Sequence, residues 1–165
     1  MNKLSFSMPD LVELGILSKP IIEFTNEDIG TEVSIPYTDV CGIISGPIIF
    51  EVIGVNHHTS VEYQHTITLM TKNIIRHAAF DANEPNNLDL DRKYLGNNRW
   101  SKSNIRQWLN SSGAANSWFI SQHKYDTAPD AKNIGYTKAG TYADEPGFLA
   151  GFSDDVLQHF TDITK

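Results

Sequence analysis

The sequence predicts an α+β fold, in which a small antiparallel sheet is joined to short packed helices and long ordered loops. Two observations lead to this class. Residues 48–55 and 65–71 carry the β-branched and alternating patterns of strands, and residues 103–109 carry a capped apolar face at helical spacing. Strands and helices of these lengths follow one another without repeats, which favours segregated α and β parts.

Three strands are predicted. Residues 48–55 (Ile-Ile-Phe-Glu-Val-Ile-Gly-Val) follow a Gly-Pro turn and form the best strand pattern in the chain. After a polar loop, residues 65–71 alternate and should pair back onto it as an antiparallel hairpin. Residues 32–37 alternate as well, but Pro36 has no N–H to donate, so this segment is expected at a sheet edge.

Three short helices are predicted from their capping residues. The first begins at Ser7 and ends at Gly15, which can adopt the left-handed conformation. The second begins at Ser101 or Ser103, and the third begins at Ser153. The buried faces of the second and third helices are expected to be Ile105, Trp108 and Leu109, and Val156, Leu157 and Phe160, respectively.

Length and charge limit the classes of protein. The 165 residues are expected to form a single domain, with an N-terminal helix and arm (1–30) and a core (31–165). The 13 basic residues are scattered among 20 acidic ones and the net charge is −7, so neither nucleic acid nor an anionic membrane is expected as a partner. Cys41 is the only cysteine, which excludes an internal disulfide.

No targeting or membrane segment is predicted. The first ten residues lack the apolar stretch of a secretory signal peptide. The most apolar stretch, 40–55, is interrupted by Gly, Pro and Glu and is shorter than the roughly 20 apolar residues of a spanning helix. Synthesis in the cytoplasm of the host cell, without a membrane anchor, is therefore expected.

The sequence gives no positive sign of catalysis. Ser45 lies in Gly-Ile-Ile-Ser-Gly, which lacks the spacing of a nucleophile elbow, and no glycine-rich phosphate loop occurs. The histidines do not show the paired spacing of zinc sites, and we interpret them as solvated loop residues: His57, His58, His65, His77, His123 and His159. We expect a protein that is not an enzyme and has no cofactor.

The segment 81–96 is polar and is predicted to be a long loop stabilised by Asx turns. It is rich in oxygen ligands, namely Asp81, Asn83, Glu84, Asn86, Asn87, Asp89 and Asp91. As an EF-hand it fails, because Asn86 stands where glycine is needed and Arg92 where glutamate is needed. Calcium bound in another loop geometry, by Asp81, Asp89 and Asp91, stays open as an alternative.

Aromatic residues in polar surroundings are the other candidates for contact. Trp108 is predicted to be core, and Trp118 with Phe119 is also expected there. Trp100 has amides nearby in the sequence, and flat aromatics beside amides are typical of protein and sugar contacts. The candidate binding residues are Asn83, Asn86, Asn87, Asn97 and Trp100.

Residues 69–160 carry several motifs in a fixed order. They are Leu-Met-Thr-Lys-Asn-Ile-Ile (69–75), Ala-Phe-Asp-Ala-Asn-Glu-Pro-Asn-Asn (79–87), Tyr-Leu-Gly-Asn-Asn-Arg-Trp (94–100), Ser-Asn-Ile-Arg-Gln-Trp-Leu-Asn-Ser (103–111), Gln-His-Lys-Tyr-Asp-Thr-Ala-Pro (122–129) and Glu-Pro-Gly-Phe-Leu (145–149). This set resembles an uncharacterised family, often encoded in prophages of Gram-positive gut bacteria, with a Ser-x-Ile-Arg-x-Trp-Leu-Asn helix.

The resemblance implies a phage-associated structural or recognition role and a fold similar to C-type lectins. Members of that family continue into a second half that this sequence lacks, so we expect an abbreviated lectin-like domain or a chain that continues beyond Lys165. In the motif helix, Ile105, Trp108 and Leu109 should pack against the 48–55 hairpin. Arg106 should project from the opposite side and bond loop carbonyls or an acid such as Asp91.

These observations predict a non-enzymatic protein on the surface of a bacteriophage virion, either decorating the capsid or part of the tail, baseplate or fibre. Its expected partners are other phage structural proteins or further copies of itself. A lectin-like module that binds a host receptor or glycan, assisted by calcium, is the first alternative. A metal-dependent enzyme is the second, and it requires histidines and carboxylates that converge on one ion.

Overall fold

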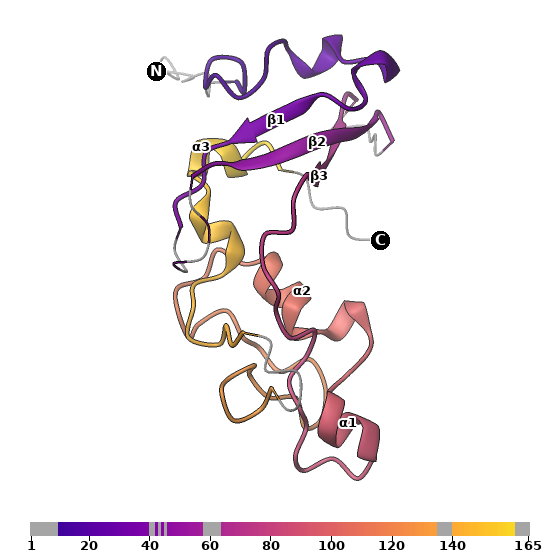
Figure 1. The fold of residues 1–165 in the computed structure, drawn as a ribbon, viewed down its shortest axis with the longest axis vertical. Coiled ribbons are helices and arrows are strands. Elements are labelled where there is room, and N and C mark those ends of the chain that lie inside the picture. Colours follow the sequence, from indigo (N-terminus) through magenta and orange to yellow (C-terminus); the bar gives the residue numbers. More distant parts are fainter. Residues whose placement is uncertain are drawn as a thin grey trace, which may run out of the picture. The chain divides into compact units, whose positions relative to one another are not determined.

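A computed structural model describes residues 10–39, 42, 44, 46–57, 64–134 and 140–160 (Figure 1). The chain divides into two compact units. Unit 1 holds the described residues of 1–38, 45–75 and 152–165, and unit 2 holds those of 39–44 and 76–151. The single domain over 1–165 stays a prediction.

The sheet of unit 1 has three antiparallel strands in the order β1-β2-β3 (Figure 1). They are β1 (Glu32–Ile35), β2 (Ile48–Val55) and β3 (Ile67–Thr71). In the register, Val33 lies opposite Phe50, and Leu69 lies opposite Val52. β1 ends before Pro36 and forms one edge of the sheet, as its missing N–H requires. The small antiparallel sheet and the short helices confirm the α+β class.

Aromatic contacts attach the last helix to unit 1. The helix α3 (Asp154–Leu157) follows the predicted N-cap Ser153, whose carbonyl accepts the N–H groups of Val156 and Leu157. Phe152 meets Tyr37 edge-on at 4.9 Å and Phe160 at 5.3 Å between ring centroids. The buried hydrophobic side chains of the unit are Ile16, Leu17, Phe24, Val33, Ile35, Tyr37, Ile48, Val52, Val55, Phe152 and Val156.

The N-terminal segment differs from the predicted helix. Ser7 lies outside the described residues, and the described part makes a turn in which Asp10 Oδ1 accepts the N–H groups of Val12 and Glu13. Gly15 ends the turn at φ +69°, in the predicted left-handed conformation. The chain after Gly15 contains the 3₁₀ turn η1 (Ile21–Glu23), and η2 (Asn26–Asp28) follows.

The polar segment of unit 2 is not the continuous loop that the sequence predicts, because it contains the helix α1 (Leu90–Leu95). Asp89 is its N-cap, and Oδ1 of this residue accepts the N–H groups of Asp91 and Arg92 at 2.9 and 3.2 Å. Gly96 ends the helix at φ +78°, where a Cβ atom would collide with the Ala82 carbonyl. The backbone therefore turns sharply back toward the segment of Ala82.

The second predicted helix is confirmed. A 3₁₀ turn, η3 (Trp100–Lys102), leads into α2 (Asn104–Leu109), and Ser103 caps α2 by accepting the Arg106 N–H at 3.3 Å. Trp108 is 2% exposed, and its indole N–H donates to the Pro146 carbonyl at 2.9 Å. The 3₁₀ turn η5 (Phe148–Gly151) closes the unit.

The apolar face of α2 packs against other residues of unit 2. This differs from the prediction, in which its partner is the 48–55 hairpin. Trp108 belongs to a cluster with Ala79, Trp118 and Tyr142, and Ile105, Leu109 and Phe148 are among the residues packed against this cluster. The rings of Trp118 and Tyr142 stack at 5.5 Å with an interplanar angle of 14°. This stack gives α2 a flat apolar surface to pack against, so α2 does not need the strands as its partner.

Arg76 is the cation that contacts this core. The sequence predicts instead that Arg106 bonds loop carbonyls or an acid. The Arg76 guanidinium lies over the Trp108 ring at 5.1 Å and pairs with the Glu145 carboxylate. Asp91, the acid proposed for Arg106, is exposed on α1. Within the described part of the chain, the hydrogen bonds of Arg106 are made by its backbone. No helix in that part is long and apolar enough to span a bilayer.

Candidate functional site

The structure gives the three acids predicted as calcium ligands different positions. Asp89 caps α1 with its carboxylate, and Asp91 is exposed in the first turn of that helix. Asp81 is buried instead, and its two oxygens accept the N–H groups of Asn104 and Asn97 at 2.8 and 2.7 Å. Only Asp81 of the three therefore belongs to a buried site.

The four candidate asparagines also separate by role. Asn97 is buried and its side chain pairs with the backbone of Arg99, while Asn87 donates to Glu84 and accepts the N–H of Asp89. Asn83 is half-buried and Asn86 is exposed. The amides of Asn87 and Asn97 are thus engaged inside the chain.

Trp100 stands apart from the other tryptophans because it is 52% exposed. The Phe80 ring, 43% exposed, lies 6.3 Å from the Trp100 ring, and the two rings are tilted by 44°. Trp118 is buried as predicted, and Phe119 is half-buried beside it. The two exposed rings are called the aromatic pair below.

Buried charge gathers around Glu84, whose side chain is 0% exposed. Arg92 donates to Glu84 Oε1 through Nε at 3.0 Å and through Nη2 at 2.6 Å. Asn87 donates to the other carboxylate oxygen. This is a charge-assisted pair in which α1 supplies the guanidinium and the preceding loop supplies the carboxylate.

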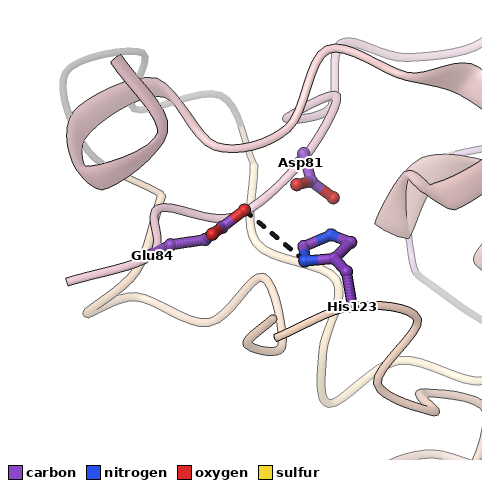
Figure 2. Close-up of side chains that lie close together, drawn as sticks. All are labelled: Asp81, Glu84 and His123. Carbon is purple, nitrogen blue, oxygen red and sulfur yellow. Dashed lines mark ion pairs between the residues drawn. The ribbon is translucent and has the colours of Figure 1, made fainter. Parts of the chain in front are cut away.

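His123 lies against the Glu84 carboxylate of this pair (Figure 2). The side chain of His123 is 9% exposed. Nδ1 is 3.6 Å from Glu84 Oε1 and 3.1 Å from Arg92 Nη2. Nε2 is 3.8 Å from Asp126 Oδ1, and no described residue forms a hydrogen bond with it. His123 therefore differs from the prediction of a solvated loop histidine, because packing against Glu84 removes its ring from solvent.

The side chain of Asn104 connects Asp126 to the backbone of Ala82. Its Oδ1 accepts the Ala82 N–H at 2.8 Å, and its Nδ2 donates to Asp126 Oδ1 at 3.1 Å. Asp126 also accepts the Gln122 N–H at 2.7 Å. The set of Asp81, Glu84, Arg92, Asn104, His123 and Asp126 is called the polar cluster below, and all its members lie in unit 2.

Within the polar cluster, burial dominates the electrostatics of Asp81. Desolvation raises the pKa of the Asp81 carboxyl to about 6, against the opposite effect of the two backbone N–H groups that it accepts. Burial also raises the pKa of Tyr142, whose hydroxyl donates to the Ala79 carbonyl at 2.7 Å. The protein thus carries an acid that is costly to ionise in the centre of unit 2.

We expect this acid to make the stability of the protein depend on pH. The pKa of Asp81 is 3.8 in a model peptide and about 6 in the fold, so the folded state binds more protons between these values. The free energy of unfolding should therefore fall as pH rises, by about 2–3 kcal/mol between pH 4 and 7.5 relative to Asp81→Asn. Urea unfolding across this range, in a buffer with chelator, measures the difference.

The variant Asp81→Asn serves as the reference because the amide does not titrate, and any loss from its altered hydrogen bonds is constant with pH. If the pH profiles of the two proteins run parallel, the buried carboxyl does not have the raised pKa. Titrating groups far from Asp81 contribute equally to both curves and cancel in the comparison.

Sequence reasoning did not identify Glu84, Arg92, His123 and Asp126 as one cluster. Glu84 and Arg92 are 8 residues apart, and His123 is a further 31 residues from Arg92. The signal that was present is the Asp89 cap, which starts α1 and thereby places Arg92 over Glu84. No comparable local pattern marks His123 or Asp126.

No protein-family model, curated protein or solved structure matches the chain. The likeness to the prophage-associated family therefore rests on the motifs in the sequence, and the lectin-like form of the fold stays a prediction.

Proposed function

We propose that this chain is a non-enzymatic binding protein of a bacteriophage particle, and that it contacts its partner through the aromatic pair of Phe80 and Trp100. The observation that carries the proposal is the exposure of these two rings on a rigid support. Exposed aromatic anchors are enriched in protein interfaces and depleted elsewhere on protein surfaces.

Hydrogen bonds around both rings hold their backbone in place. The Trp100 carbonyl accepts the Ser103 N–H at 3.1 Å and the Ser103 hydroxyl at 3.0 Å. The Phe80 carbonyl accepts the Ile105 N–H at 3.2 Å. Both aromatics are thereby attached to the N-terminus of α2, and a pre-ordered anchor loses less conformational entropy on binding.

The surroundings of the pair favour a protein over a sugar as partner. Two of the four candidate amides, those of Asn87 and Asn97, are engaged within the chain, which leaves fewer polar groups for a sugar. Unit 2 also exposes aliphatic and aromatic side chains at and beside α1, namely Leu88, Leu90, Tyr94 and Leu95. Such apolar groups suit a protein interface.

The burial of the polar cluster supports a role without catalysis. Its carboxylates are directed at a guanidinium, an asparagine amide and backbone N–H groups, and the side chains of Glu84 and Asp126 are 0% and 1% exposed. General acid–base chemistry needs a group that reaches the substrate. This arrangement serves the order of unit 2 better than it serves a reaction.

The place in the particle follows from the motif resemblance given above. The proposed partner is another phage structural protein, or a second copy of this chain, at the capsid surface or in the tail, baseplate or fibre. Mass spectrometry and electron microscopy of purified particles test this location. The protein should be found in mature virions at a fixed stoichiometry, and its absence from them would remove the proposal.

The contact surface is tested with tagged variants expressed in place of the natural chain. Trp100→Ala and Phe80→Ala should each weaken binding to the particle about 30-fold or more, as expected for aromatic anchors. Met70→Ala is the control, because Met70 is exposed to a similar degree in unit 1 and should bind normally. Equal incorporation of all three variants would contradict the assignment.

Glycan binding is a separate outcome of the same variants. If the chain is found outside the particle interface and binds a glycan array in a manner abolished by Trp100→Ala, the lectin-like alternative replaces the present proposal. Calorimetric titration with calcium then tells whether that binding uses the ion.

A further inference from the structure

We propose that the polar cluster binds a divalent transition-metal cation, with zinc as the best match, through Asp81, Glu84 and His123. This inference concerns how unit 2 is held together and does not depend on the proposed binding function. The cation would join the loop before α1 to the segment of His123, which is far from that loop in sequence.

The geometry of the three side chains is the first argument. Each residue offers one ligand atom, and these atoms lie within 4.8 Å of one another. Zinc bonds to nitrogen and oxygen of about 2.0–2.2 Å place neighbouring ligand atoms roughly 3–4 Å apart. A contraction of about 1–2 Å, within the reach of side-chain rotation, would therefore form the site.

The second argument is independent of the first, because it concerns an unsatisfied atom. His123 Nε2 is buried and lacks a hydrogen-bond partner among the described residues. Figure 2 shows this nitrogen on the side of the ring that faces the Asp81 carboxylate, while Nδ1 faces Glu84. A buried ring nitrogen without a partner is unfavourable unless it accepts a ligand there.

The third argument is charge balance. The cluster contains three carboxylates and one guanidinium, which leaves two net negative charges when the imidazole is neutral. Buried charge of this kind is normally paired or bound to metal. A divalent cation neutralises this excess of negative charge.

The donor set selects the class of metal. Imidazole nitrogen with carboxylate oxygen suits zinc and neighbouring first-row cations, whereas calcium prefers oxygen ligands alone. A coordinated histidine commonly donates its other ring N–H to a carboxylate or carbonyl. His123 Nδ1 has the Lys124 carbonyl at 3.4 Å for this purpose, and Arg92 would shift away from Nδ1.

The test uses the full chain, stripped with chelator and dialysed against micromolar zinc. Elemental analysis should find one zinc per chain, and X-ray absorption should show nitrogen and oxygen ligands with the scattering of one imidazole. The melting temperature should rise by roughly 5–10 °C at a hundredfold excess of zinc over Kd. Calcium at the same concentration should have no such effect.

His123→Gln should abolish stoichiometric binding and the shift in melting temperature. His77→Gln is the matched control, since His77 is an exposed histidine of the same unit and should leave both unchanged. A wild-type chain that binds no zinc overturns the proposal, as does zinc that is retained in folded His123→Gln. Should His123→Gln fail to fold, the absorption spectrum of the wild-type site decides, and sulfur or imidazole-free ligation counts against the proposal.

Discussion

Replacing Trp108 with alanine should lower the free energy of unfolding by about 3–5 kcal/mol, as measured by urea denaturation. The indole is almost fully buried, packs against the rings of Tyr142 and Phe148 at 5.5 Å each, and lies under the Arg76 guanidinium. Truncation would leave a cavity in the centre of unit 2. It would also leave the Pro146 carbonyl without its donor.

Trp100→Ala is the matched control, because it makes the same chemical change at an exposed position. Its cost should stay within about 1 kcal/mol, since the indole has little surface to lose from the core. If the two variants were equally destabilised, the assignment of Trp108 to the core and Trp100 to the surface would be wrong.

Replacing Arg92 with methionine should cost about 3–5 kcal/mol in chelator-containing buffer, because it leaves the Glu84 carboxylate buried without its cation. The length of methionine retains most of the apolar stem of arginine, so the loss is mainly electrostatic. Chemical denaturation of the wild-type and variant chains at neutral pH measures the effect.

Two further variants make this result specific. Lys72→Met removes a cation from Glu32 in an exposed pair of unit 1 and should leave the free energy of unfolding almost unchanged, because solvent screens the pair. The double variant of Arg92→Met with Glu84→Met should recover part of the loss, because no unpaired carboxylate remains. A double variant that is less stable than Arg92→Met would show that the pair contributes through packing instead of charge.

The sheet and α2 could be predicted because their signals are local. β2 occupies the predicted 48–55, where β-branched residues follow a Gly-Pro turn, and Pro36 correctly marks β1 as an edge. For α2, Ser103 and the spacing of Ile105, Trp108 and Leu109 contain the whole pattern within two turns. These elements are set by neighbours in sequence.

The helix α1 could not be predicted with the same rules because its periodic signal is weak. It spans six residues, none of them buried, and it stands within a polar segment. Its start is marked by Asp89, a residue that the sequence analysis assigned to a candidate calcium loop. A capping side chain and a metal ligand are the same residue type, so composition alone does not distinguish them.

The partner of α2 and the polar cluster depend on contacts between distant residues. Trp118 and Tyr142 lie in a stretch without sustained period, and the bond from Tyr142 to Ala79 spans 63 residues. The contacts among Glu84, Arg92 and His123 likewise join separate turns. The sequence supplies the residue types for such contacts, but their pairing depends on how the loops fold.

The two hydrogen bonds that the Asp81 carboxylate accepts limit where unit 2 can be engineered. One carboxylate receives the N–H groups of Asn97 and Asn104, so the path between these residues must keep its length for both bonds to form. Peptide insertions between 97 and 104 should therefore disrupt the unit. The exposed turn at Pro85 and Asn86 is closed in a similar way, because Asn87 donates to the carbonyl and to the carboxylate of Glu84, so an insertion there should disrupt the unit as well.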